Sequence, residues 1–275
     1  MRIQCEICPH HCSLLPGQVG RCRARRNEDG RIVCDNYGRI TSFALDPVEK
    51  KPLHKFYSGS QVLSVGSYGC NLSCPFCQNH NISMADEAGS DYRYLSPQAL
   101  VDQAVKYTSR NNIGLAFTYN EPFIGYEYVR DCAVLCHEKG LQNVLVTNGY
   151  VNEGPLLALL PYIDAMNIDL KGFTDSFYKK LGGDLSTVKN TIRLAHSFCH
   201  VEVTTLVIPG ENDSEKEITE LAEWIAGIDR NIPLHLSRFF PCYQYKGKPP
   251  ADISSIYRLV KVAEKHLTYV YPGNC

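Results

Sequence analysis

A regular alternation of strand and helix patterns, from residue 61 to residue 271, is the feature that most constrains the fold. Short apolar runs rich in β-branched residues predict strands over 61–67, 114–119, 143–147, 165–170, 201–208, 233–239 and 268–271. Between them, helices are expected over 97–111, 124–139, 154–160, 174–198, 214–227 and 252–266. Strands that alternate with helices form right-handed crossovers and a parallel sheet. The expected fold class is therefore α/β, a partial (β/α)6 TIM-like barrel.

Composition limits what such a chain can do. Of its 275 residues, 44% are hydrophobic and 21% are charged, values that are typical of a globular protein. The formal net charge of −1 argues against a surface dedicated to nucleic acid or to membranes. No apolar run approaches about 18 residues, and the first residues, MRIQCEICPHHC, lack the apolar core of a signal peptide. We therefore expect a cytoplasmic protein with no nucleic-acid partner and no membrane partner.

The chain has 13 cysteines, which is unusual for a reducing compartment, and an odd number cannot all pair in disulfides. Cys70, Cys74 and Cys77 share one tight segment, the cysteine loop, with the spacing C-x3-C-x2-C. Three thiolates can hold three irons of a [4Fe–4S] cluster. The loop offers no fourth cysteine, so one iron would stay open to another ligand, as in catalytic metal sites. A zinc knuckle, or a chance clustering of small buried cysteines, is the alternative interpretation.

Polar residues follow the predicted strands at the end where parallel sheets of this class bind ligands. Each is a weak signal alone, because a loop or a helix cap is the usual reason for such a residue. Together, and beside the cysteine loop, they form a candidate site. They are Thr118-Tyr119-Asn120-Glu121-Pro122, Thr147-Asn148-Gly149-Tyr150, Asn167 with Asp169 and Lys171, Asn212 with Asp213, and Ser237 with Arg238.

The cysteine spacing resembles the signature of the radical S-adenosylmethionine (SAM) superfamily, in which an aromatic residue, here Phe76, precedes the third cysteine. The resemblance implies a [4Fe–4S] cluster on the cysteine loop, with SAM chelating the open iron through its amino and carboxylate groups. It also implies that an electron from an external low-potential donor cleaves SAM to methionine and a 5′-deoxyadenosyl radical, which abstracts hydrogen from a substrate. The cofactor carries this chemistry, and the protein orients it.

The same resemblance gives roles to the polar residues. Asn120-Glu121-Pro122 occupies the place of the family's Gly-Gly-Glu motif, so Glu121 is expected to accept a charge-assisted hydrogen bond from the ammonium of SAM. Asn148 and Asp169 are expected to bond hydroxyls, and Lys171 to pair with the carboxylate; a local salt bridge is the alternative for Asp169 and Lys171. The expected cofactor-binding residues are Phe76, Asn120, Glu121, Thr147, Asn148, Asp169 and Lys171.

Further motifs resemble one branch of that superfamily, the AmmeMemoRadiSam system radical SAM enzymes, which are similar to pyruvate formate-lyase-activating enzymes. This branch implies a protein substrate, or companion proteins of the Memo and AMMECR types. Glycyl-radical activases usually carry Gly-Gly-Glu-Pro where this chain has Tyr119-Asn-Glu-Pro122, which weakens activation of a glycyl-radical enzyme as the alternative. The motifs are Cys5-x2-Cys8-Pro9-x2-Cys12, Asp46-Pro-Val-Glu-Lys-Lys-Pro-Leu53, Cys77-Gln78-Asn79, Thr118–Pro122 and Ser237-Arg238-Phe239.

Five other cysteines suggest further roles: a set of four near the amino terminus, and Cys242. The amino-terminal cysteine set, Cys5, Cys8, Cys12 and Cys22, has the ligand count of a closed tetrahedral zinc site or of a second iron–sulfur cluster, and zinc is preferred. Residues 1–60 are therefore expected to form a small cysteine-rich lobe that a metal staples, and residues 61–275 the barrel. Cys242 follows the sixth strand and is expected to line the substrate chamber as a catalytic hydrogen-atom donor.

Two interpretations from other functional classes stay open at this point. A non-catalytic iron–sulfur electron carrier would have no need of Glu121 or of the pair Asp169 and Lys171. A scaffold protein stapled by zinc would contain neither iron nor sulfide.

Overall fold

The computed structural model describes all residues from Met1 to Cys275 and contains one large sheet and three two-stranded ones. The strands are β1 (Ile3–Gln4), β2 (Ser13–Leu14), β3 (Arg25–Glu28), β4 (Arg31–Cys34), β5 (Arg39–Ile40), β6 (Ser42–Pro47), β7 (Gln61–Gly66), β8 (Arg93–Tyr94), β9 (Asn112–Phe117), β10 (Gln142–Thr147), β11 (Ala165–Asp169), β12 (His200–Val207), β13 (Leu234–Arg238) and β14 (Val270–Gly273). The helices are α1 (His80–Ser83), α2 (Pro97–Lys106), α3 (Tyr126–Glu138), α4 (Glu153–Leu159), α5 (Asp175–Leu181), α6 (Leu185–His196), α7 (Glu215–Asp229) and α8 (Ile253–Ala263).

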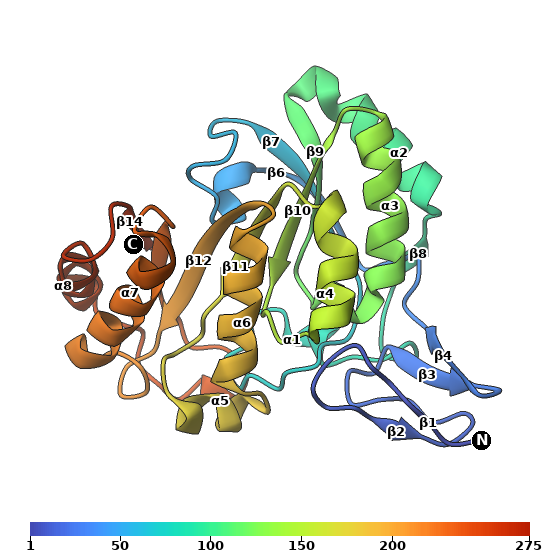
Figure 1. Ribbon diagram of the computed structural model, residues 1–275, viewed down its shortest axis with the longest axis horizontal. Coiled ribbons are helices and arrows are strands. Elements are labelled where there is room, and N and C mark those ends of the chain that lie inside the picture. The colour runs from blue at the N-terminus through green and yellow to red at the C-terminus, as the bar shows by residue number, and fades with distance from the viewer.

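The large sheet confirms the predicted fold class. Its order is β14-β13-β12-β11-β10-β9-β7-β6, and every neighbouring pair is parallel except β6 with β7. Six β/α units lead from β7 to β14, with α5 and α6 together between β11 and β12. Figure 1 shows these helices along one side of a curved sheet, as in a partial (β/α)6 barrel.

Local capping explains where the helices begin and end. The hydroxyl of Ser96 accepts a hydrogen bond from the amide of Ala99 at 3.2 Å, which starts α2 at Pro97. The single helical stretch expected over 174–198 is two helices. Gly182, with φ of +80°, ends α5, and Asp184 starts α6 by accepting from the amide of Thr187 at 2.7 Å.

The segment that follows β6 closes the amino-terminal end of the barrel. Val48 and Leu53 are fully buried against Val62, Ala116, Val144 and Ala165, which come from four neighbouring strands. The side-chain amide of Asn167 donates to the carbonyl of Pro52 at 2.8 Å. Val48 and Leu53 of the motif Asp46–Leu53 therefore have a structural role, whereas Asp46 accepts a hydrogen bond from Tyr119 of the predicted site.

The amino-terminal hairpins β1–β2 and β3–β4 form a small lobe at the lower right of Figure 1. Arg25 fastens this lobe to the barrel, because its guanidinium donates to the carboxylate of Glu127 on α3 at 2.6 and 2.8 Å. Strand β6, in contrast, pairs with β7 in the large sheet, so Ser42–Pro47 belong to the barrel sheet. Division of the chain into domains at residue 60 stays a prediction.

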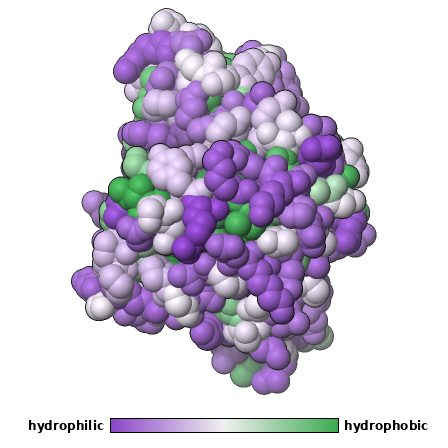
Figure 2. Space-filling model, turned by 90° about the vertical axis from the view of Figure 1, so that its left-hand side faces the viewer, coloured by the Kyte–Doolittle hydropathy of each residue, from purple (hydrophilic) through white to green (hydrophobic).

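The outer surface is mainly hydrophilic on the side that Figure 2 shows. Figure 2 shows the side on which α7, α8 and β14 lie, where hydrophilic residues dominate and hydrophobic ones are scattered among them. None of the helices is both long and apolar enough to cross a membrane.

Candidate active site

A cleft with an empty volume of about 1020 Å³ lies at the carboxyl ends of the parallel strands. The structure brings ten of the residues predicted from the sequence to its wall. They are Cys70, Cys74, Cys77, Phe76, Asn120, Glu121, Thr147, Asn148, Asp169 and Lys171.

The cysteine loop follows β7 and is tightly bonded within itself. The amide of Leu72 donates to the thiol of Cys70 at 3.4 Å, and the amide of Cys77 donates to the carbonyl of Cys74 at 3.2 Å. Burial raises the pKa of the Cys70 thiol well above its usual value and that of Cys74 to about 11. Thiolates at these positions therefore need a cationic partner, which bound metal supplies.

The donor set of the cleft fits an iron–sulfur cluster better than a single metal ion. No three His, Cys, Asp or Glu side chains of the chain converge closely enough to hold one ion. In a cubane cluster each thiolate binds a different iron, so the thiols surround a volume and do not meet at a point. Three soft thiols that line one cleft, on a loop without a fourth, meet that requirement.

Glu121 is the most constrained acidic residue of the cleft. It is 2% exposed, and it accepts hydrogen bonds from the amide of Phe123 at 3.0 Å, the hydroxyl of Thr147 at 2.8 Å and the amide of Asn148 at 2.8 Å. Burial raises its pKa to about 7, although these donors oppose the shift. Two of the three donors share one carboxylate oxygen, so the other oxygen keeps room for a further donor from the cleft.

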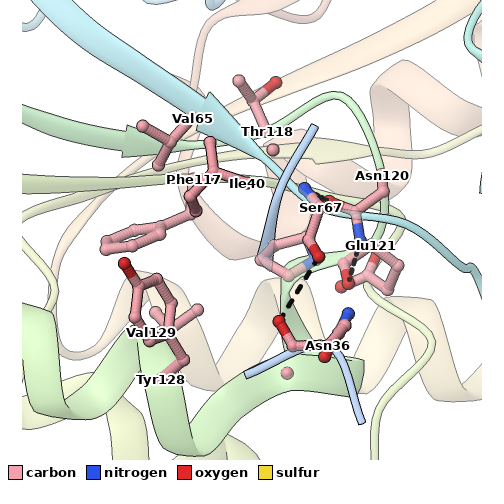
Figure 3. Close-up of a pocket in the computed structure, with 13 residues that line it drawn as sticks. Asn36, Ile40, Val65, Ser67, Phe117, Thr118, Asn120, Glu121, Tyr128 and Val129 are labelled. Carbon is pink, nitrogen blue, oxygen red and sulfur yellow. Dashed lines mark hydrogen bonds between the residues drawn. The ribbon is translucent and has the colours of Figure 1, made fainter. Parts of the chain in front are cut away.

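The neighbouring Asn120 positions the cysteine loop. Its side-chain oxygen accepts from the amide of Ser67 at 3.0 Å, and its amide donates to the carbonyls of Tyr68 and Gly69, each at 3.2 Å. A small cavity of about 350 Å³ lies beside this group. Figure 3 shows Asn36 and Tyr128 on its other sides. Because the Asn120 amide is already bonded, the structure favours a positioning role over direct contact with a cofactor.

Asn148 joins the end of β10 to the same loop. Its side-chain amide donates to the side-chain oxygen of Asn71 at 2.9 Å and to the Cys70 thiol at 3.5 Å. Its own side-chain oxygen accepts from the amide of Tyr150 at 2.8 Å. Hydrogen bonds of this kind to a ligating sulfur orient the ligand and tune the metal that it binds.

Asp169 and Lys171 form the local salt bridge that was the alternative interpretation of this pair, with 2.8 Å between Lys171 Nζ and Asp169 Oδ2. Burial opposes the positive charge of Lys171, but Asp169 and the nearby Cys74 outweigh burial and raise the lysine pKa. Both side chains line the cleft, so the salt bridge does not remove them from a ligand's reach. Apart from its cysteines, the cleft has three charged residues, which are Glu121, Asp169 and Lys171.

Thr204 lines the cleft although the sequence did not single it out, whereas Tyr119 belongs to a predicted polar stretch. Thr204 on β12 is 9% exposed, and its hydroxyl has no hydrogen-bond partner in the protein. Tyr119 lines the cleft with φ of +72°, and its hydroxyl donates to Asp46 at 2.9 Å. A threonine within a strand is ordinary in sequence, so only the structure identifies the unpaired hydroxyl of Thr204 as a feature of the site.

Phe76 gives the cleft an aromatic wall. Its ring is 4% exposed and is stacked on Phe177 at 6.2 Å between centroids, with Tyr245 tilted against it at 6.0 Å. Apolar lining with a few polar groups is the usual composition of a cofactor pocket.

Cys242 is placed differently from the expectation. It lies beside the cysteine loop, with its thiol 3.6 Å from the carbonyl oxygen of Cys77, but it is not among the residues that line the cleft. The loop after β13 places the Cys242 thiol against the backbone of the cysteine loop. The catalytic role of Cys242 stays a prediction without support from this geometry.

The amino-terminal cysteine set lies outside the cleft as well. All four cysteines line a separate small cavity in the lobe, together with Arg25. Their thiols do not meet at one point, as the preferred tetrahedral zinc site requires.

Comparison with known protein families matches the model of the radical SAM superfamily to residues 64–222. This match covers more than half of the chain and contains the cysteine loop and the cleft residues Glu121 to Thr204. The chain belongs to the radical SAM superfamily.

Individual relatives agree with this assignment. An uncharacterized protein of Methanocaldococcus jannaschii is 39% identical over 276 residues, which span 99% of this chain and 81% of that protein. The pyruvate formate-lyase 1-activating enzyme of Escherichia coli is 28% identical over 194 residues, spanning 68% of this chain and 74% of the enzyme. The crystal structure of Streptococcus suis SuiB bound to its precursor peptide SuiA shares the fold, with a TM-score of 0.61, 14% identity, and coverage of 76% of this chain and 47% of SuiB.

Family membership establishes the general character of the protein. It is an enzyme, and the cofactors of its family are a [4Fe–4S] cluster and SAM. Its similarity to activating enzymes confirms the predicted resemblance to that group.

Proposed function

We propose that this enzyme cleaves SAM reductively in the cleft, with a [4Fe–4S] cluster held by the three thiols of the cysteine loop. The bound cluster, once reduced by an external donor, would supply one electron to the sulfonium of SAM, which would give methionine and a 5′-deoxyadenosyl radical able to abstract hydrogen from a substrate. The observation that carries the proposal is the position of three thiols, and no fourth, in one cleft with a carboxylate and an ammonium group. An iron without a protein thiolate is free to bind SAM.

The polar residues of the cleft match the groups of SAM. The free lone pair of Glu121 is suited to the SAM ammonium, and the charge of Lys171 to its carboxylate. Asp169 and Asn148 are suited to the ribose hydroxyls, and Phe76 adds an apolar wall. Asn120 and Thr147 act by positioning other residues. Asn120 hydrogen-bonds the backbone that leads into the cysteine loop, and Thr147 hydrogen-bonds the carboxylate of Glu121.

The substrate we propose is a protein or a peptide. Two relatives support this class, because one is a pyruvate formate-lyase-activating enzyme and another was solved with a precursor peptide bound. Companion proteins of the Memo and AMMECR types, and membership of the AmmeMemoRadiSam branch, are part of the same proposal. Activation of a glycyl-radical enzyme is the second candidate, which the similarity to activating enzymes favours. An external low-potential protein is proposed as the electron donor.

Anaerobic incubation with SAM and a strong reductant tests the proposal. We expect the reconstituted enzyme to form 5′-deoxyadenosine and methionine in equal amounts, even without its substrate. Absence of 5′-deoxyadenosine from protein that contains iron and sulfide and binds SAM would overturn the proposal. Deuterium that appears in 5′-deoxyadenosine from a labelled candidate peptide would then identify the substrate class.

The unpaired hydroxyl of Thr204 gives a more specific prediction. A buried hydroxyl without a partner is costly, so we expect it to bond a polar group of SAM. Thr204→Val keeps the shape and removes this bond, which should weaken SAM binding by roughly 3- to 10-fold in equilibrium dialysis. Thr205→Val is the matched control, because the Thr205 hydroxyl donates to the carbonyl of Leu170 and does not line the cleft. Equal SAM affinity in both variants would contradict the assignment.

A further inference from the structure

The amino-terminal cysteine set surrounds a cavity of its own, with an empty volume of about 320 Å³. The amide of Cys5 donates to the carbonyl of Cys12 at 3.0 Å, which brings two of the thiols together. Cys22 reaches the same cavity from the turn that precedes β3. Cys5, Cys8 and Cys22 are buried, and four soft thiols in one enclosed place form a metal-binding donor set.

Arg25 provides a hydrogen-bond donor at this cavity that has no acceptor. The side chain is 4% exposed, and its two terminal nitrogens bond the carboxylate of Glu127 and the carbonyl of Ile124. Its third nitrogen, Nε, is buried and has no partner. An orphaned buried donor is costly, so the cavity is expected to contain an acceptor for it. The sulfides and thiolates of an iron–sulfur cluster are such acceptors, and hydrogen bonds to them tune its potential.

The cavity and the cysteine loop are direct neighbours. Gly69, which precedes Cys70, lies against the backbone of Cys22, and a Cβ at Gly69 would stand 2.4 Å from the Cys22 carbonyl oxygen. With φ of +87°, Gly69 also has a conformation that other residues rarely adopt. Glycine at position 69 therefore lets the cysteine loop contact the backbone at Cys22 of the amino-terminal cysteine set.

Asn71, on the other side of Cys70, completes the connection. Its carbonyl is 2.8 Å from Nε2 of His10, which lies between Cys8 and Cys12 in sequence. Its side-chain oxygen accepts from the amide of Asn148, which also donates to the Cys70 thiol. Asn71 thus connects His10, in the segment of the amino-terminal cysteine set, to Asn148 and through it to Cys70 of the cysteine loop.

We propose that the amino-terminal cysteine set holds a second iron–sulfur cluster, which passes electrons one at a time to the cluster on the cysteine loop. A one-electron protein donor reduces the second cluster, and this cluster is reoxidised when its electron moves through the Asn71 contact. The cluster on the cysteine loop gains that electron, so the balance closes without a further reactant. The relay rests on the proposed function, whereas the presence of the second cluster does not.

Metal and sulfide analysis of the variant Cys70→Ala/Cys74→Ala/Cys77→Ala tests for the second cluster. After anaerobic reconstitution we expect equal amounts of iron and acid-labile sulfide, about two or four of each per chain, since four cysteines suit either cluster type. We also expect an electron paramagnetic resonance signal after reduction. Zinc without sulfide would overturn the proposal, as would wild-type protein that contains only one cluster.

The potential of that cluster tests the role of Arg25. Arg25→Gln, made in the same triple-cysteine background, removes a positive charge and the Nε donor, so the cluster should become harder to reduce. Glu127→Gln weakens the same ion pair without removing Arg25 from the cavity, and it controls for disturbance of the lobe. A more negative potential in Arg25→Gln alone supports the placement. Equal potentials in both variants would overturn it.

Magnetic interaction between the clusters tests the relay separately. In fully reduced wild-type protein we expect each cluster to broaden the signal of the other, and we expect this broadening to vanish in the triple-cysteine variant. Two independent signals would overturn the relay even if both clusters are present. If the second cluster is found but SAM is not cleaved, the proposed function and the relay fail while the metal site stands.

Discussion

Cys74→Ala should reduce the formation of 5′-deoxyadenosine by at least about 100-fold, because changes in groups that merely support metal ligands already cost 10- to 100-fold. Cys74 is buried in the cleft, and burial raises the pKa of its thiol to about 11. Its thiolate is therefore stabilised by bound metal, and alanine leaves one iron without its ligand. Iron content and 5′-deoxyadenosine, measured on the same anaerobic sample, check this prediction.

Cys199→Ala is the matched control for that variant. Cys199 is a partly buried free cysteine, whose thiol is 3.6 Å from the carbonyl oxygen of Ala195 and which lies outside both cysteine groups. It should keep the iron and the activity of the wild type. If Cys74→Ala matched this control in cluster content and turnover, the cysteine loop would not be the site of the active cluster.

Glu121→Gln should weaken SAM binding by roughly 10- to 100-fold, the range expected when a charge-assisted hydrogen bond is lost. Glutamine keeps the size of the side chain but removes its charge and turns one acceptor into a donor. The new NH2 group of glutamine then faces either the amide of Asn148 or the hydroxyl of Thr147. Both of these groups donate to the carboxylate in the wild type, so a donor then faces a donor. Equilibrium dialysis with labelled SAM measures the change.

Dependence on pH separates the charge of Glu121 from its structural bonds. Burial raises its pKa to about 7, so the carboxylate gains a proton as the pH falls through 7 and loses its attraction for the SAM ammonium. SAM affinity should therefore fall between pH 8 and pH 6 in the wild type, and this loss should be absent in Glu121→Gln. Identical pH profiles would contradict the assigned contact.

A second buried glutamate controls for general damage. Glu217 is 9% exposed and accepts from the amide of Phe173 at 2.6 Å, at the start of α7 and outside the cleft. Glu217→Gln likewise turns one buried acceptor into a donor, so it should lower stability. It should leave SAM affinity unchanged. A comparable loss of SAM affinity in both variants would show that Glu121 acts only through the fold.

Much of the barrel could be predicted from the sequence because its parallel strands are buried, apolar and separated by capped helices. The exceptions have physical causes. The break between α5 and α6 depends on Gly182 and the cap at Asp184, which interrupt an otherwise continuous helical pattern. Strand β6 owes its place to pairing with β7, a tertiary contact that no local pattern within Ser42–Pro47 reveals.

The site, like the barrel, could be predicted from the sequence only in part. Spacing alone placed the three thiols together, and the rule that ligands bind at the carboxyl ends of parallel strands gathered the polar residues. Sequence patterns do not show which groups a side chain hydrogen-bonds in the folded protein. Asn120 and Glu121 are neighbours in one motif, yet the first is bonded to the cysteine loop and the second keeps a free lone pair. The orientation of Cys242 and the unpaired hydroxyl of Thr204 likewise depend on the folded backbone.

Direct coordination of SAM by the cluster is the central claim, and electron–nuclear hyperfine spectroscopy measures it most directly. The reduced enzyme would be prepared with SAM that carries 15N in its amino group or 17O in its carboxylate. We predict that both labels couple to the electron spin of the cluster, since the cysteine loop leaves one iron without a thiolate. Bound SAM that shows no coupling from either label would contradict the account.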